Sequence, residues 1–256
     1  MPVSGCPQTP GPGLMESACC VYTACSVSET PSTRAMGSES ANCPLVGVVV
    51  AIFAVHERTL RLLLVRRMRG PHHQRWVLPG GRVRLDENLE DCARRELAEQ
   101  AGICGVYLEQ LYTFGRVSAD PRGRVVNIAY YAVMPPDRVM LRQIAGAGEA
   151  EWFGFDALPI LEFDHQEIVT AARRRLAAKL NYSTVAFQLV PEMFTLGELQ
   201  EVYEIIRGAD LDKRNFRRRV LALGAIEETC EKRNDGRSRP ARLYRARQPG
   251  SVAIVR

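Results

Sequence analysis

The sequence predicts an α/β protein with two folded domains, and three observations support this prediction. The chain has 256 residues, more than the ~100–150 of a typical single domain. Residues 45–182 alternate between apolar strand patterns and two main helices, whereas residues 192–247 follow the order helix, turn, basic helix and hairpin. With 46% hydrophobic and 25% charged residues, the composition is typical of a globular protein in water.

Residues 1–44 differ from the rest of the chain. They are rich in Ser, Thr, Pro, Gly and Cys and have no hydrophobic periodicity, so we expect them to be disordered. Met15 and Met36 are alternative start positions within this segment. No secretory signal and no apolar run of ~18–20 residues is present. The eight cysteines form no C-x-x-C pair. We therefore expect a cytoplasmic protein without a zinc site and without membrane contact.

The first domain, 45–182, begins with a predicted hairpin. Apolar segments at 46–55 and 60–66 flank a polar turn at 56–59. Asp164, with Glu167 three residues later, predicts a capping box at the start of a long helix. We place a short strand at 76–78 and a helix at 89–101. Three strands follow at 107–114, 125–134 and 151–155. A helical turn at 157–161 precedes the long helix, which we place at 165–180.

The second domain follows a segment, 183–191, that we expect to be an extended linker because Pro191 limits helix formation. Thr195 and Glu198 predict a capping box for a helix that ends at Gly208. Asp210 or Asp212 caps a second, basic helix over 213–221. Two strands, 226–229 and 241–244, flank the turn signal at 234–236. This order of elements is that of a winged helix-turn-helix domain.

Residues 81–103 carry the most informative pattern, GRVRLDENLEDCARRELAEQAGI. Positions three and four apart lie on one face of a helix, so Glu96, Glu99 and Gln100 share a face. Mg²⁺ and Mn²⁺ prefer oxygen ligands such as carboxylates, and such an ion screens a diphosphate before water attacks it. Gly81 and the glycine before it allow the backbone to approach a phosphate closely. The pattern is therefore suited to a metal ion and a phosphate.

Gln100 weakens that prediction for catalysis, because an amide keeps the size of a glutamate but removes its charge. We expect Glu96 and Glu99 to bind Mg²⁺ or Mn²⁺ weakly, and we expect no catalytic residue. Glu87, at the start of the helix, is placed to pair with Arg95. The alternative is a solvated acidic face, which the fixed spacing after Leu78-Pro79-Gly80 argues against.

Three arginines border the loop that we expect at 78–81 and the strands before it. They are plausible partners for a diphosphate, although arginines at strand ends are more often surface charges. The residues expected to bind a ligand are Arg66, Arg67, Gly81, Arg82, Glu96 and Glu99.

The C-terminal part of the chain carries a concentrated positive charge. Residues 213–256 hold 13 basic and 4 acidic side chains, a net charge of +9, whereas residues 1–184 are nearly neutral. A cationic region at one end of a neutral protein indicates a polyanionic partner. The alternatives are a solvated charged face or an Arg-rich helix in an oligomer interface. The order of the elements favours DNA.

The basic helix is where sequence would be read, because Arg recognises guanine and Asn recognises adenine in the major groove. Other cations, among them Arg219, Lys232 and Arg233, suit phosphates or a narrow minor groove. The residues expected to contact DNA are Lys213, Arg214, Asn215, Arg217, Arg218, Arg237 and Arg239.

The motif over 81–103 resembles the Nudix box, G-x5-E-x7-R-E-U-x-E-E-x-G-U, in which U is aliphatic. The matching positions are Gly81, Glu87, Arg95, Glu96, Leu97, Glu99, Gly102 and Ile103. This resemblance implies a Nudix α/β/α sandwich with a site for a diphosphate. Gln100 stands where the pattern has its last glutamate, so the resemblance also implies that Glu96, Glu99 and Gln100 are the remnant of a catalytic set. Together with FTLGELQEVYEIIRGADLDKRNFRRRVL at 194–221, residues 45–247 resemble the Nudix-related transcriptional regulators of NAD metabolism.

That resemblance implies a homodimer that binds a palindromic operator and represses genes of NAD synthesis or salvage. It also implies ADP-ribose or a related NAD-derived nucleotide as the signal, bound by a Nudix domain that in many members has lost hydrolase activity. Other branches of the family regulate pentose use. Two hypotheses therefore remain: a ligand-sensing repressor, favoured by Gln100 and the basic helix, and an ADP-ribose-type hydrolase, which the intact Glu96 and Glu99 keep open.

Overall fold

The computed structural model describes residues 43–68, 73–117, 123–138, 149–234 and 240–254. The disorder expected over 1–44 falls, up to residue 42, outside the described residues. In chain order the elements are β1 (Leu45–His56), β2 (Thr59–Arg66), β3 (Trp76–Val77), β4 (Gly80–Arg82), α1 (Leu89–Ala101), β5 (Tyr107–Phe114), β6 (Val125–Met134), η1 (Pro136–Arg138), β7 (Ala150–Gly154), η2 (Phe155–Ala157), α2 (His165–Lys179), η3 (Val185–Leu189), α3 (Leu196–Arg207), α4 (Lys213–Ala222), β8 (Ile226–Arg233) and β9 (Ala241–Ala246).

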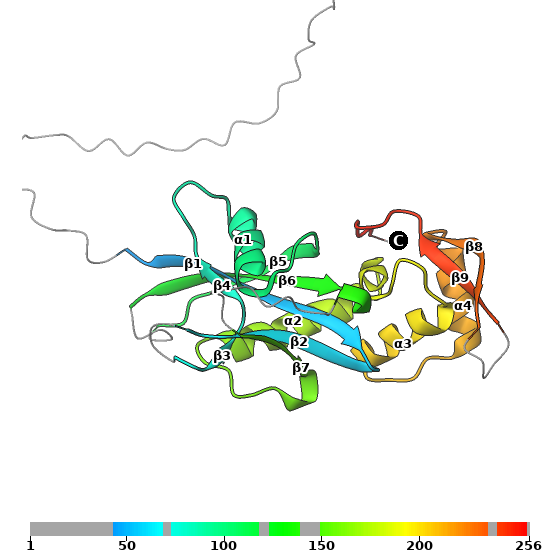
Figure 1. Cartoon of the computed structure of the whole chain (residues 1–256), viewed down its shortest axis with the longest axis horizontal. Helices are drawn as coiled ribbons and strands as arrows, with labels where there is room; N and C mark the ends of the chain where they lie inside the picture. Colours follow the sequence, from blue (N-terminus) through cyan, green and yellow to red (C-terminus); the bar gives the residue numbers. More distant parts are fainter. Residues whose placement is uncertain (1–42, 69–72, 118–122, 139–148, 235–239, 255–256) are drawn as a thin grey trace, which may run out of the picture. The chain divides into compact units, whose positions relative to one another are not determined.

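The first domain is built around one mixed sheet. Among the described residues its strands follow the order β3-β2-β1-β6-β5, with β4 paired to β1 and β7 paired to β2. Strand β1 is central: it runs parallel to β6 and antiparallel to β2 and β4. Helices α1 and α2 lie on opposite faces of this sheet (Figure 1). The predicted α/β/α sandwich is confirmed.

Strand β1 explains why the sequence shows a continuous apolar run rather than an alternating one. Its side chains point alternately to the two faces of the sheet, and both faces are covered. Val48, Val50 and Ile52 pack with α1, whereas Val49 and Phe53 pack on the side of α2. A strand buried on both sides needs apolar residues at every position.

Strand β4 was not predicted, because a loop was expected at 78–81. Gly80 and Gly81 instead pair with Val49 and Val48 of β1. A Cβ at Gly80 would lie 2.3 Å from the carbonyl oxygen of Val48, so only glycine allows this approach of the two strands. The glycines therefore fix the motif to the central strand of the sheet.

Helix α2 begins where predicted, but not with the predicted capping box. The carboxylate of Asp164 accepts no bond from the helix. It accepts instead from Arg116, whose Nε lies 3.1 Å away. The buried acid is thus paired with a cation from another segment, which outweighs local capping. The helical turn expected at 157–161 is observed earlier, as η2.

The segment 183–191 is not the extended linker that was expected. It contains the 3₁₀ helix η3, in which Val185, Ala186 and Leu189 are buried. The ring of Phe187 stacks on Phe194, with 6.0 Å between centroids. The apolar side chains of this segment join the core on the α2 side of the sheet to the core of α3 and α4. Burial of these residues, which sequence position alone does not reveal, selects a compact conformation.

The second domain has the predicted order of elements. Thr195 and Glu198 form the capping box of α3, which ends at Gly208. Asp212, rather than Asp210, caps α4 by accepting a bond from the backbone of Asn215. Strands β8 and β9 extend beyond the predicted segments, and the turn between them, at 235–239, lies outside the described residues. Within the described part of the chain, no helix is long and apolar enough to cross a membrane.

Candidate functional site

The Nudix motif forms a charged cluster centred on Arg95 of α1. Its guanidinium binds both oxygens of Glu87, at 2.9 Å and 2.7 Å. It also donates to Glu96 at 2.6 Å and to Glu99 at 3.3 Å. The Arg95 hydrogen bonds lower the pKa of Glu87 to about 2, and the same contacts raise the pKa of Arg95. The predicted pair of Glu87 and Arg95 is confirmed, and two further carboxylates share it.

Glu96 is fixed against the glycine strand. It is the buried carboxylate of the cluster, with 7% of its surface exposed. A Cβ on Gly81 would lie 2.0 Å from its Oε1 atom, so this contact also requires glycine. The motif therefore needs Gly81 to make room for Glu96, in addition to allowing a close approach to a ligand.

Gln100 makes contacts that a glutamate could not make in the same way. Its Nε2 donates to the carbonyl oxygen of Gly80 at 2.8 Å and to Oε2 of Glu96. Its Oε1 accepts from the Gly80 nitrogen at 3.3 Å. A carboxylate has no hydrogen to donate to either oxygen. Gln100 thus connects strand β4 to Glu96 through its neutral amide.

The two predicted metal ligands, Glu96 and Glu99, have other partners in this cluster. Arg95 forms ion pairs with Glu87, Glu96 and Glu99, and Arg84 pairs with Glu99. Glu96 pairs with Arg95 and accepts a hydrogen bond from Gln100. Glu99 pairs with Arg95 and, at 3.6 Å, with Arg84. Among the described residues, no group of three His, Cys, Asp or Glu could hold a metal ion.

His165, the first residue of α2, binds the same loop from the other side. Its Nδ1 accepts a hydrogen bond from the backbone nitrogen of Leu78 at 3.1 Å. Burial lowers the pKa of His165 to about 3, with a smaller contribution from the charge of Arg67. His165 is therefore neutral at physiological pH, and its Nδ1 is free to act as the acceptor. The sequence reading missed this residue, because no local pattern links positions 87 residues apart.

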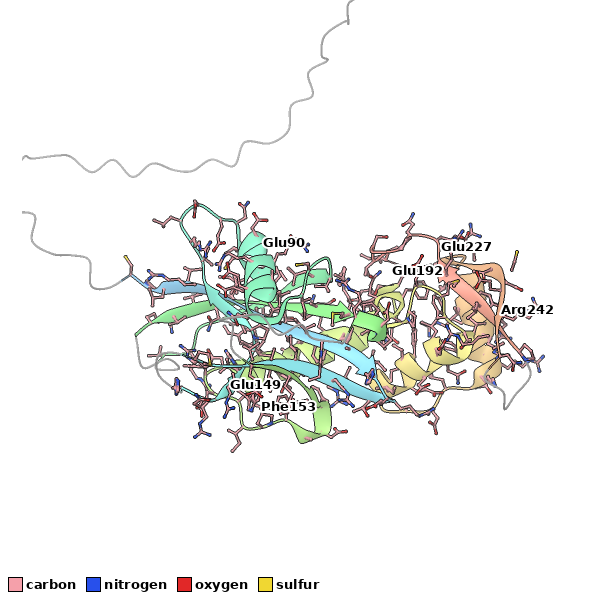
Figure 2. All side chains as sticks on the ribbon, in the orientation of Figure 1. Glu90, Glu149, Phe153, Glu192, Glu227 and Arg242 are labelled. Atoms are coloured by element: carbon pink, nitrogen blue, oxygen red, sulfur yellow. The ribbon has the colours of Figure 1, made fainter. Side chains whose placement is uncertain are left out.

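The other arginines predicted to bind a ligand lie beside this loop but not in the Arg95 cluster. Arg66 pairs with Glu149 at 2.9 Å, and its guanidinium lies over the Trp76 ring, 5.8 Å from the centroid. Arg67 lies over the ring of Phe163, 5.3 Å from its centroid. Figure 2 labels Glu149 and Phe153 on this side of the sheet. The structure brings Gly81, Arg82, Glu96 and Glu99 together and places Arg66 and Arg67 apart from them.

Helix α4 has the opposite electrostatic character. Phe216 and Val220 are buried against α3, where Phe216 meets Tyr203 edge to face at 5.2 Å. The helix contains no acidic residue. The predicted DNA contacts that lie on it are all exposed: Lys213, Arg214, Asn215, Arg217 and Arg218. Asn215 and Arg218 hydrogen bond to each other at 2.9 Å.

The hairpin β8–β9 departs from the prediction in one residue. Arg233 does not project as a free cation; it pairs with Glu198 and donates to the carbonyl oxygen of Met193 at 3.0 Å. It therefore supports the capping box of α3, whose carboxylate attracts it. Figure 2 labels Arg242, which pairs with Glu228 at 2.7 Å on this hairpin. The predicted contacts Arg237 and Arg239 lie outside the described residues.

Comparison with known families agrees with this geometry. A model of the NUDIX domain matches residues 45–174, and a model of the NrtR DNA-binding winged helix domain matches residues 186–246. The chain is thus a Nudix domain joined to a DNA-binding winged helix domain.

The most similar relatives define the family more closely. The chain is 42% identical over 206 residues to the ADPR responsive transcriptional repressor NtrR of Acinetobacter baylyi, which covers 79% of this chain and 82% of that protein. It resembles the crystal structure of Shewanella oneidensis NrtR complexed with a 27mer DNA, with a TM-score of 0.70 and 37% identity over 78% of this chain and 93% of that one. The chain belongs to the NrtR family.

A relative from the wider Nudix family is named as an enzyme. An ADP-ribose pyrophosphatase of Methanocaldococcus jannaschii is 32% identical over 120 residues, which is 47% of this chain and 70% of that protein. The match does not extend over the whole chain.

Proposed function

We propose that this chain is a DNA-binding transcriptional repressor of NAD biosynthesis or salvage genes. It senses ADP-ribose or a related NAD-derived nucleotide through its Nudix domain. One observation carries the proposal: a chain whose Nudix carboxylates are neutralised internally also presents an exposed helix with five cations and no acid. The similarity to an ADPR responsive repressor supports it. Such a protein acts in the cytoplasm, where it meets operator DNA.

The DNA contacts of the proposed repressor come from α4 and the hairpin. Arg214, Arg217 and Arg218 are suited to guanine, and Asn215 to adenine. Lys213 is suited to a phosphate, as are Arg237 and Arg239, which lie outside the described residues. We propose that two copies bind a palindromic operator, because two-fold protein symmetry matches repeated half-sites.

The effector contacts come from the Nudix domain. We propose that Gly81 and Arg82 face the diphosphate, with Arg66 and Arg67 beside the loop and with Glu96 and Glu99 close to the ligand. No metal is required in this proposal, because Arg95 already compensates the carboxylates. A weak Mg²⁺ or Mn²⁺ site at Glu96 and Glu99 would have to displace that guanidinium.

A direct binding measurement tests the proposal. Fluorescence anisotropy with promoter DNA of NAD-synthesis genes should give tight binding with two chains per duplex, and ADP-ribose should weaken it. A scrambled duplex is the control for the DNA, and AMP is the control for the effector. Equal affinity for promoter and scrambled DNA would contradict the proposal. The Kd for ADP-ribose should be the same in EDTA and in millimolar Mn²⁺.

The second candidate is an ADP-ribose hydrolase, which the similarity to a pyrophosphatase favours. Incubation of the protein with Mn²⁺ and ADP-ribose distinguishes the two functions. The repressor proposal expects almost no AMP, whereas turnover of ~1–10³ s⁻¹ would establish an ordinary enzyme. Gln100→Glu adds the missing charge, and a gain in AMP release in that variant would identify Gln100 as the main defect.

A further inference from the structure

Helix α2 is bonded at its first residue to the proposed effector loop. His165 accepts the backbone hydrogen of Leu78 at 3.1 Å, and the glycines that follow Leu78 are those of the Nudix motif. The imidazole is buried and neutral, so no water competes for this bond. A displacement of the loop toward a bound nucleotide therefore acts directly on the start of α2.

The other end of α2 is bonded to the DNA-binding helix. Arg219 of α4 donates from Nη2 to the carbonyl oxygen of Asn181 at 3.0 Å. Asn181 lies two residues beyond the last residue of α2, where the helix dipole favours a cation. Arg219 is thus the one cation of α4, among the described residues, with a hydrogen bond to the Nudix side of the chain.

Between these two bonds α2 is packed along its length. Ile168, Val169, Ala172 and Leu176 are fully buried in the core between α2 and the sheet. A closely packed helix moves as a unit rather than bending. The two ends of α2 are therefore mechanically connected, and a shift at His165 is transmitted to Asn181.

The contact between α2 and α4 is less closely packed. A cavity of about 160 Å³ lies beside the Arg219–Asn181 bond. Its walls include Leu180 from the end of α2, Tyr203 from α3, and Val220 and Leu223 from α4. This cavity is partly open to solvent, and exposed residues such as Asn215 and Arg219 also line it. The cavity leaves space in which α4 can change its position without a clash.

We infer that His165 and Arg219 make α2 the connection between the effector loop and the DNA-binding helix. This inference rests on the proposed function. Effector binding at the loop shifts α2, changes the Arg219–Asn181 bond and moves α4 into the adjacent cavity. Operator DNA, which holds α4 in place, acts on the loop by the reverse route, because coupling between two sites is reciprocal.

The coupling factor measures this connection. It is the Kd for ADP-ribose with saturating operator divided by the Kd without DNA, and it should be ~5–150 in the wild type. Arg219→Gln should bring the factor close to 1 and leave the Kd without DNA unchanged. Arg174→Gln is the matched control: it removes an exposed cation of α2 that has no bond to Asn181 and no proposed contact with DNA, so its factor should remain at the wild-type value.

Two further variants address the loop and the cavity. His165→Gln retains an acceptor for Leu78 and should keep most of the coupling, whereas His165→Leu should lose it. Leu223→Phe fills the cavity and should lower the factor, even though it leaves the Arg219–Asn181 bond in place. If the wild type couples but Arg219→Gln and Leu223→Phe couple equally well, the inference is wrong and the proposed function stands. A wild-type factor of 1 overturns both.

Discussion

The charged cluster around α1 and the charged face of α4 use arginine in opposite ways. In the cluster, Arg95 is bonded to three carboxylates and is largely buried. On α4, the cations are exposed and the helix has no acid. The first arrangement stabilises a fixed geometry, and because its charges are paired it produces only a weak electrostatic field at the protein surface. The second leaves its charge available to a polyanion. The role of an arginine-rich region therefore depends less on the number of its arginines than on whether carboxylates pair with them.

The largest expected effect on stability comes from removing Arg95, the cation at the centre of the charged cluster around α1. Arg95→Met should lower the free energy of unfolding by about 2–4 kcal/mol, because it leaves Glu87 and Glu96 without their partner. The upper limit is below that of a fully buried pair, since the Arg95 side chain is 17% exposed. Urea unfolding measures the change. DNA affinity of the folded fraction should stay the same if the two regions are electrostatically independent.

A matched variant separates this effect from a general loss of charge on α1. Arg94→Met removes the neighbouring arginine, whose partner is the exposed Glu90. An exposed pair on a helix contributes about 0.3–0.5 kcal/mol. If Arg94→Met destabilised the protein as much as Arg95→Met, the cluster would not be the special feature of this helix.

Acid should also destabilise the protein through His165, the first residue of α2. The pKa of His165 is lowered to about 3, against ~6.5 in an unfolded chain. The unfolded state thus binds more protons below pH 6.5, and stability falls as the pH decreases from 6.5 toward 3. The loss should be about 2 kcal/mol at pH 5. In His165→Gln, which does not titrate, the difference in stability between pH 7.5 and pH 5 should shrink by that amount.

Another group sets the lower limit of this pH experiment. The pKa of Glu87, lowered to about 2 by Arg95, gives a stability that is present above pH 4.5 and is lost only as the pH falls toward 2. An equal pH dependence in His165→Gln and the wild type would show that another group is responsible.

The elements that the sequence predicted correctly depend on local patterns. Strand β1 is visible as an apolar run, and α3 is marked by its capping box and by Gly208. The missed features depend on contacts between distant residues. Strand β4 exists because Gly80 meets Val48, and η3 is compact because its apolar side chains are buried. The propensity of the local sequence contains neither fact.

The same distinction holds for the candidate site. The spacing of the motif placed Gly81, Glu96 and Glu99 together correctly, because helix geometry fixes their separation. It did not reveal that Gln100 hydrogen bonds to Gly80, or that His165 holds Leu78. The pairing of Arg233 with Glu198 was also missed, because charge counting cannot tell a paired cation from a free one.

Removing a cation from α4, which contains no acidic residue, should affect DNA binding and not stability. Arg214→Ala should weaken operator binding by about 1–3 kcal/mol if the side chain reads a base. Its stability should change by less than about 0.5 kcal/mol, because Arg214 is exposed. Arg94→Ala, on α1, is the control for loss of one positive charge and should bind operator like the wild type. Operator binding by Arg214→Ala at full strength would remove Arg214 from the contact set.

The smallest expected effect on DNA affinity distinguishes the cations of α4 that contact phosphates from those that contact bases. Lys213, at the start of α4, is expected to contact a phosphate, so Lys213→Ala should weaken operator and scrambled DNA equally, by less than about 1 kcal/mol. Each phosphate contact releases counterions, so the slope of log K against log salt should become shallower by about 1. Arg214→Ala should instead reduce the preference for operator over scrambled DNA. Titrations at several salt concentrations on both duplexes separate the two behaviours. If Lys213→Ala also lowered that preference, Lys213 would be reading bases, and α4 would present one uniform recognition surface rather than a phosphate contact followed by base contacts.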